Sequence, residues 1–335
     1  MSDKKEPLFK VVSSFGSGNN SEETEKEPET QEAPVEKKIE FNDNISNDEI
    51  NRVLEEGAAK NKKGKNLMII GIILFVISML MTSFIKVVFM FGGIIIACIG
   101  FAMKHTAKND VKMEAGIHII HQAMGEVFES FEYQPEKGLE VEDVANIEMG
   151  FPFDFNQLDS DDLIVGTYKG MKIRMADTTL NLVTTSTDED GNERKNTEKV
   201  FEGLWMICDF GKELTTDLTI TEGIHTKKNR VKTDNEKFNK KFGIYSLNPH
   251  EAFYILTPHV MEYILEMDKK SYGDTYMNFS HEGKLSIAIN TGHAAFEIDS
   301  FKMSADEMRN KFVSEVRYIT GLLDELSHVD TMYKD

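Results

Sequence analysis

The stretch LMIIGIILFVISMLMTSFIKVVFMFGGIIIACIGFAM, from Leu67 to Met103, decides the architecture of this 335-residue chain. It contains a single charged side chain, Lys86. As one α-helix it would be about 55 Å long, whereas the hydrocarbon core of a bilayer is about 30 Å thick. We therefore predict a transmembrane hairpin over residues 66–104, with two spans at about 67–81 and 87–103.

Lysines on either side of this stretch indicate its orientation. Only Lys86 lies between the two predicted spans. Because cytoplasmic flanks carry the excess of basic residues, we predict a multi-pass plasma-membrane protein with both termini in the cytoplasm. The flanking lysines are Lys60, Lys62, Lys63 and Lys65 before the first span and Lys104, Lys108 and Lys112 after the second.

Small residues form one face of the second span, at Gly93, Ala97 and Gly100. Small side chains allow two helices to approach closely in a membrane. This face therefore either packs the two spans of one hairpin together or joins two copies of the chain.

The composition limits the classes of function. The chain has a formal net charge of -19, and a general nucleic-acid binder needs a basic surface, so no nucleic-acid partner is expected. The two cysteines, Cys98 and Cys208, cannot form a disulfide framework and fit a reducing compartment.

Two segments precede the hairpin. Residues 1–44 are acidic, rich in Glu, Pro, Thr and Lys and poor in apolar residues, which predicts a disordered tail. Residues 45–65 are expected to form a short juxtamembrane helix with a basic flank, and Ser46 and Glu49 have the spacing of a capping box.

Residues 105–335 are expected to form a cytosolic α+β domain, a mostly antiparallel sheet with flanking helices. A helix with a heptad-like apolar stripe is predicted from Met113 to Phe131, packed on the domain or forming a dimer seam. The last helix is expected to begin at a capping box formed by Ser304 and Glu307. Hairpins are predicted for 163–168 with 171–175, for 180–187 with 200–210 and for 275–280 with 284–290, a short strand is predicted at 252–256, and Thr257 is expected to cap a helix that starts at Pro258.

Few residues point to catalysis or metal binding. Glu114, His118 and His121 share one flank of the first cytosolic helix, with the spacing of metal ligands or of a solvated helix surface. Asp154, Asp159, Asp161 and Asp162 lack the glycine and glutamate of a calcium loop and are expected to form a solvated loop. His250-Glu251 and His281-Glu282 lack the second histidine of a zinc-protease helix. No motif requires a cofactor, so none is predicted.

A basic segment interrupts the acidic chain between residues 227 and 241. Beside a cytoplasmic leaflet, each such residue gains about 1 kcal/mol from anionic lipid. A solvated loop or a site for an acidic protein partner are the alternatives. Its basic residues are Lys227, Lys228, Arg230, Lys232, Lys237, Lys240 and Lys241.

Four stretches resemble a known family: FEYQPEKG (131–138), DLIVGTYKG (162–170), VFEGLWMICDF (200–210) and FNKKFGIYS (238–246). They resemble the bacterial membrane proteins of the domain of unknown function 3137 (DUF3137), over roughly 107–329. That resemblance implies a paired hydrophobic segment followed by one domain, and it implies no catalytic residues.

These observations favour a non-enzymatic, membrane-tethered binding or regulatory module, with the lipid bilayer and a protein partner or second copy as its contacts. A membrane-associated hydrolase is the first alternative, with a site assembled only in the fold around residues such as His250, Glu251 or His281. A subunit of a transport complex is the second, although Lys86 alone provides no intramembrane ion pathway.

Overall fold

The computed structural model describes residues 46–80, 85–187, 193–223, 229–297 and 303–328. The tail over residues 1–44, for which the sequence predicts disorder, lies outside the described residues.

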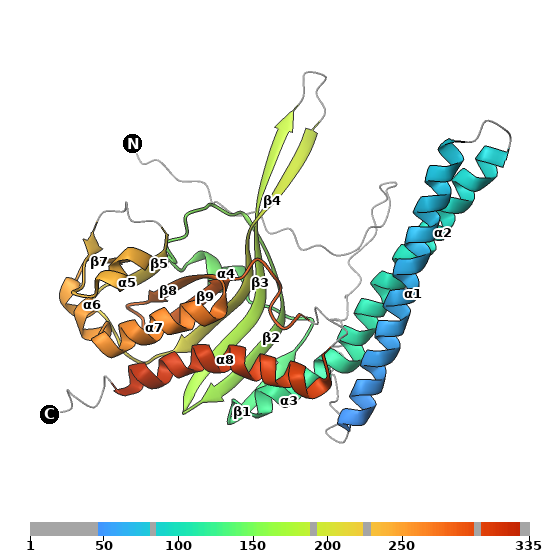
Figure 1. Ribbon diagram of the computed structural model, residues 1–335. Helices are drawn as coiled ribbons and strands as arrows, with labels where there is room; N and C mark the ends of the chain where they lie inside the picture. The colour runs from blue at the N-terminus through green and yellow to red at the C-terminus, as the bar shows by residue number, and fades with distance from the viewer. Residues whose placement is uncertain (1–45, 81–84, 188–192, 224–228, 298–302, 329–335) are drawn as a thin grey trace, which may run out of the picture.

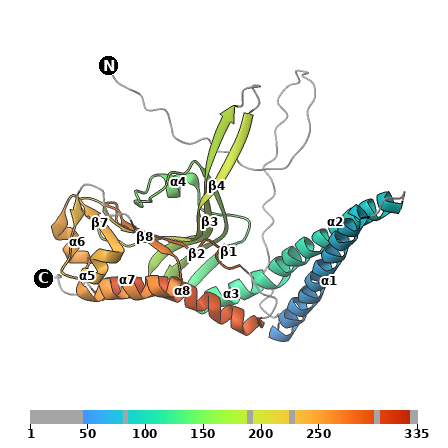
Figure 2. The same ribbon diagram turned by 45° about the horizontal axis from the view of Figure 1, so that its top comes forward.

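Two long helices begin the described chain, α1 (Asn47–Met79) and α2 (Ile85–Val111). They lie side by side and project away from the sheet domain (Figures 1 and 2). The Ser46 hydroxyl accepts a hydrogen bond from the Glu49 amide at 3.3 Å and caps α1. The separate short helix expected over 45–65 is not formed, because no proline interrupts α1 before its apolar half.

Only one helix in the described part of the chain is long and apolar enough to cross a membrane, Ile85–Lys108. The apolar part of α1, residues 67–79, would be about 20 Å long. This length falls short of the roughly 30 Å hydrocarbon core. The second span therefore remains a proposal, which is taken up below.

Beyond α2 the chain continues through a π-helical turn, η1 (Lys112–Gly116), into α3 (Ile117–Gly125). The predicted helical stripe ends too late, since Phe131 lies in the first strand. Ile117, Ile120 and Met124 are buried in the main core, where α3 packs against the last helix. Because these side chains are covered within one chain, they do not form a dimer seam.

A nine-stranded sheet forms the domain, with the strand order β1-β2-β3-β4-β9-β8-β5-β7-β6. Every pair of neighbouring strands is antiparallel, which confirms the predicted α+β class. The strands are β1 (Ser130–Gln134), β2 (Gln157–Tyr168), β3 (Met171–Thr187), β4 (Glu193–Asp209), β5 (Leu218–Glu222), β6 (Arg230–Val231), β7 (Phe242–Ser246), β8 (Asp274–Phe279) and β9 (Lys284–Asn290). The remaining helices are α4 (Val141–Ala145), α5 (Glu236–Lys241), α6 (Pro249–Ile255), α7 (Pro258–Ser271) and α8 (Ala305–His328).

The two faces of the sheet carry separate cores. Alternate residues of a strand point to opposite faces, so Met206 and Cys208 contribute to the larger core beneath α3, α7 and α8. Trp205 and Ile207 point to the smaller core on the other face, with Val144 of α4 and an aromatic cluster around Phe151. Cys208 is fully buried, as the sequence predicts for a small apolar residue.

Turn and cap signals in the sequence are confirmed in several places. Lys169 and Gly170 adopt positive φ between β2 and β3, and Ser304 and Glu307 form the capping box of α8. The Thr257 hydroxyl accepts a hydrogen bond from the Val260 amide and caps α7. The predicted strand over 252–256 is wrong, because Asn248 caps a helix, α6, over these residues, with Pro249 in its first turn.

The β3–β4 hairpin is longer than the sequence predicts and extends past the rest of the sheet (Figures 1 and 2). We predicted that the second strand begins at residue 200, yet β4 begins at Glu193 and pairs with β3 from there. A register shift opposite Leu180 and Asn181 leaves Val200 as an extra residue in β4. Bulges of this kind bend and twist a strand. We call residues 182–187 and 193–199 the β3–β4 arm.

Candidate functional site

The hairpin of α1 and α2 is the first candidate site. All but four of the large apolar side chains that are exposed in the described part of the chain lie on it, between Ile69 and Phe101. The base of the hairpin packs against the domain, because Ile50 and Leu54 of α1 are buried in the main core. Lys60 Nζ lies 2.6 Å from Asp110 Oδ2, which ties α1 to α2 there.

Glycines bring α1 and α2 into close contact. A Cβ atom added to Gly71 would lie 2.4 Å from the Ala97 nitrogen and 2.5 Å from the Gly93 oxygen. One added to Gly100 would lie 2.6 Å from the Gly64 oxygen. The small face of Gly93, Ala97 and Gly100 therefore lies against α1 within one chain. Its counterparts on α1 are Gly64 and Gly71, which were not predicted from the sequence.

Three carboxylates, of which those of Asp162 and Asp177 are buried, gather where the hairpin joins the domain. Oxygen atoms of Asp161, Asp162 and Asp177 all lie within 4.8 Å of one another. Lys112 of η1 extends its ammonium group to within 2.9 Å of Asp162 Oδ2 and 3.2 Å of Asp161 Oδ2. The Tyr133 hydroxyl donates to Asp162 Oδ1 at 2.6 Å. We call these five residues the carboxylate cluster.

The backbone of β2 places Asp162 inside the protein. Asp162 has a φ of +55°, at a register shift between β2 and β3, and it is only 1 % exposed. The solvated loop predicted for Asp154, Asp159, Asp161 and Asp162 is therefore wrong for the last three. All three lie in β2, and the irregular backbone turns Asp162 inward, which an alternating pattern cannot indicate.

Burial dominates the electrostatics of the cluster. It raises the pKa of Asp162 against the opposing effects of Lys112 and the Tyr133 hydroxyl. It also raises the pKa of Asp177 to about 7, although the Ala295 amide donates to Asp177 Oδ1 at 2.9 Å. Burial alone would lower the pKa of Lys112, but the carboxylates of Asp162 and Asp161 raise it overall.

The cluster suits a structural junction better than a catalytic centre. Asp162 and Asp177 are 1 % and 6 % exposed, so a substrate cannot reach them without rearrangement. Carboxylate oxygens are the ligands that Mg²⁺ and Ca²⁺ prefer, but Lys112 already places a cation between Asp161 and Asp162. The arrangement joins η1 to β2 through an ion pair.

A groove of about 500 Å³ lies over β1 to β4 on the face of the sheet opposite α8. Asp143 of α4 holds Arg174 at its side, with Nη1 at 2.8 Å from the carboxylate. The lining combines both signs of charge with apolar surface, and it contains none of the residues that the sequence suggests for catalysis, metal binding or lipid contact. Its residues are Ser130, Phe131, Glu132, Val165, Gly166, Thr167, Lys172, Ile173, Arg174, Ile207 and Asp209.

The weak metal candidates lie on two consecutive elements, Glu114 on η1 and His118 and His121 on α3. His118 and His121 are half-buried on α3, and the His121 ring lies 4.8 Å from that of Phe131. The side chain of Glu114 lies outside the described residues. Among the described residues, Asp161, Asp162 and Asp177 are the group close enough to share an ion.

The basic segment divides into exposed and structural residues. Lys232, Lys237 and Lys240 are exposed. Arg230 donates to the Asn239 carbonyl at 2.8 Å. Lys241 pairs with Glu222 and with the buried Asp268, the latter at 3.0 Å. Lys227 and Lys228 lie outside the described residues.

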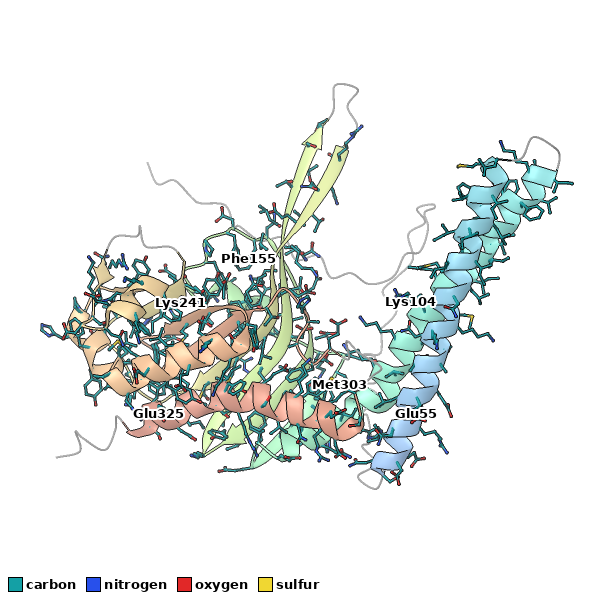
Figure 3. All side chains as sticks on the ribbon, viewed as in Figure 1. Glu55, Lys104, Phe155, Lys241, Met303 and Glu325 are labelled. Atoms are coloured by element: carbon teal, nitrogen blue, oxygen red, sulfur yellow. The ribbon has the colours of Figure 1, made fainter. Side chains whose placement is uncertain are left out.

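This segment also lies far from the hairpin. Figures 1 and 2 show α5 and β7 at the end of the sheet remote from α2. Figure 3 shows the same separation between Lys241 and Lys104, a lysine at the base of the hairpin.

Residues of the predicted hydrolase alternative do not converge. Glu251 of α6 accepts hydrogen bonds from the Thr215 amide and hydroxyl. The exposed His281 pairs with Asp217, with Nδ1 at 2.7 Å from Oδ1, and this hydrogen bond raises its pKa. Neither residue lines the groove over β1 to β4.

Comparison with known proteins identifies a family. Residues 199–328, from the end of β4 through α8, match the family described as "Protein of unknown function (DUF3137)". The match is shorter than the resemblance noted over 107–329. No curated protein matches the chain, and no solved structure does. The β4–α8 region of the chain is therefore similar to the DUF3137 family.

Proposed function

We propose that this protein is a membrane-tethered binding or regulatory module, with the α1–α2 hairpin inserted in the plasma membrane. The observation that carries the proposal is the apolar surface that surrounds both helices between Ile69 and Phe101. A helix that is apolar on all sides requires either a protein core or a membrane around it. The hairpin projects away from the core, so the membrane is the environment that covers it.

The energetics support insertion of both helices. Fully burying one Ile, Leu, Val or Phe side chain contributes about 1.5 to 3 kcal/mol, and more than a dozen such side chains are exposed on the hairpin. Insertion then gains on the order of 20 kcal/mol. The short apolar part of α1 costs fractions of a kcal/mol per Å of mismatch, which snorkelling of Lys62, Lys63 and Lys65 reduces.

The distribution of lysines supports a cytoplasmic domain. Lys60 and Lys108 lie at the base of the hairpin beside the domain, whereas Lys86 lies near its far end. The positive-inside tendency then places the base in the cytoplasm and Lys86 at the opposite surface of the membrane.

The contacts at the base support a fixed orientation of the domain on its anchor. The Asn51 side chain accepts a hydrogen bond from the Ala305 amide at 2.8 Å, so α1 contacts the start of α8. Lys108 pairs with Glu297, and Lys112 joins η1 to the carboxylate cluster. A domain held in this way presents the same surfaces to the cytoplasm in every molecule.

A protein partner fits the exposed basic residues better than the lipid around the hairpin does. Lys232, Lys237 and Lys240 lie at the end of the sheet remote from α2. An acidic partner in the cytoplasm reaches this surface without bending the base of the hairpin. The inaccessibility of Asp162 and Asp177 favours binding over hydrolysis.

Membrane extraction tests the proposal. The full chain is expected to stay in the membrane pellet after alkaline carbonate treatment. Ile73→Lys combined with Ile95→Lys places two charges on the apolar surface and is expected to abolish retention. The matched control is Leu247→Lys with Phe253→Lys, which alters exposed apolar residues outside the hairpin. Release of the unaltered chain by carbonate would exclude an inserted hairpin.

A further inference from the structure

The β3–β4 arm has a free strand edge. β4 pairs with β9 only from Gly203 onward. Next to that point the Glu202 amide and carbonyl are occupied by the Asn290 side chain and by the amides of Thr291 and Gly292. Residues 193–199 pair with β3 on one side and with no described strand on the other, and all seven are exposed. An unpaired strand edge is a template for pairing with another strand.

The charges along residues 193–199 are complementary to those of a second copy of the same segment that runs in the opposite direction. When two copies of residues 193–199 pair antiparallel about a two-fold axis at Asn196, Arg194 lies opposite Glu198 of the second copy, and Glu193 lies opposite Lys199. The symmetry repeats both pairs, so the interface contains four opposite-charge pairs. Opposite charges directly across antiparallel strands stabilise the pairing.

Neighbouring registers lose this complementarity. Because alternate residues direct their backbone groups to opposite edges of a strand, the neighbouring registers move the two-fold axis by one whole residue. An axis at Lys195 places the two copies of Lys195 opposite each other, and an axis at Thr197 places Lys195 opposite Lys199. Like charges directly opposite each other destabilise a strand pair. The sequence thus favours one register among those that leave the arm paired along its length.

Within the arm, Arg194 lies opposite Ser186 of β3, and Glu198 lies opposite Leu182. Lys199 contacts Glu202 of its own chain at 2.7 Å, and it would share this contact with Glu193 of the second copy. Exchanging the charges of Arg194 and Glu198 therefore tests the pairing without disturbing the contact between Lys199 and Glu202.

We propose that the β4 edge of the arm is a homodimer interface, in which residues 193–199 of two copies pair antiparallel about Asn196. The four strands of two arms then form one small sheet between the domains. An isolated two-stranded ribbon is marginally stable in water, and four strands are more stable. Tethering to one membrane raises the effective concentration of the two arms.

Disulfide cross-linking of the full chain in membranes tests this interface. Asn196→Cys in a Cys98→Ser background is expected to form a covalent dimer under mild oxidation, because position 196 faces itself across the axis. Thr184→Cys is the matched control: it lies opposite Asn196 within the arm, but on the strand farther from the axis, and is expected to stay monomeric. Equal cross-linking at both positions, or none at 196, would overturn the proposal.

Charge exchange tests the register in the same Asn196→Cys background. Arg194→Glu alone and Glu198→Arg alone place like charges opposite each other and are expected to lower the dimer yield at least about fivefold. The two together restore opposite charges and are expected to restore the yield. Trp205 fluorescence should match the parent in all variants, since the arm is exposed. A double variant no better than the singles would refute the pairing.

Discussion

Lys112, the first residue of the π-helical turn after α2, forms an ion pair with Asp162, with Nζ at 2.9 Å from Oδ2. It connects the end of the candidate membrane helix to β2, the strand next to the β1 edge of the sheet. Asp162 is almost fully buried, whereas the Lys112 side chain is 42 % exposed. This ion pair is one of the contacts that join the domain to the α1–α2 hairpin.

Removing this lysine is expected to destabilise the domain. In Lys112→Met, the carboxylates of Asp161 and Asp162 lose their cation. We expect a loss of about 1 to 3 kcal/mol, because the exposure of Lys112 reduces the roughly 3 to 5 kcal/mol of a fully buried pair. Trp205, the one tryptophan of the chain, is fully buried and reports unfolding through its fluorescence. Adding Asp162→Asn should recover part of the loss, and an additive further loss would contradict the pairing.

The stability of the domain is expected to depend on pH through Asp177. Burial raises the pKa of Asp177 to about 7, so the folded state binds a proton that the unfolded state releases above about pH 4. This contribution is fully present below the unfolded pKa and is lost as pH rises through the folded pKa. Between pH 4 and 7.5 the parent should lose stability relative to Asp177→Asn, by up to a few kcal/mol. Parallel pH profiles of the Trp205 transition would contradict this assignment.

Valine substitutions at two adjacent glycines of α2 are expected to have different effects on the packing of α1 against α2. A Cβ atom added to Gly93 would lie 2.7 Å from the Gly71 oxygen and the Phe75 nitrogen, whereas none of the described atoms lies within 4 Å of one added to Gly92. Gly93→Val should therefore separate α1 from α2, and Gly92→Val should not. Spin labels at Ile73→Cys and Ile95→Cys, in the Cys98→Ser background, measure this separation. The same distance in both variants would show that the glycine contact does not hold the hairpin.

Two lysines of α5 provide a second matched pair. Lys241 pairs with Glu222 and with Asp268, which is 6 % exposed, whereas Lys237 is exposed. Lys241→Gln should lower the midpoint of the Trp205 transition, because it leaves the buried carboxylate of Asp268 without its cation. Lys237→Gln should leave the midpoint within experimental error. A similar loss in both variants would assign the effect to net charge.

Helix caps and turns are predicted well from the sequence where a single residue or dipeptide determines them. Caps at Ser46, Thr257 and Ser304 and the turn at Lys169-Gly170 depend on neighbouring residues alone, and each is present. The strand proposed for 252–256 failed because the cap at Asn248 outweighs a short apolar run.

The carboxylate cluster was beyond sequence reasoning. Asp161 and Asp162 are adjacent in the chain, but Lys112, Tyr133 and Asp177 come from three other elements, and sequence spacing does not indicate that they meet. The bulge that buries Asp162 depends on the pairing of β2 with β3. It places this carboxylate inside the protein, whereas a run of acidic residues predicts a solvated loop.

Accessibility of position 86 tests the membrane anchor most directly. In a Cys98→Ser background, Lys86→Cys and Ser327→Cys are treated in intact cells with a membrane-impermeant maleimide, with Cys208 buried. If the hairpin crosses the membrane, Lys86→Cys is expected to be labelled from outside and Ser327→Cys only after permeabilisation. Protection of both positions in intact cells, with equal labelling after permeabilisation, would contradict a hairpin that crosses the membrane.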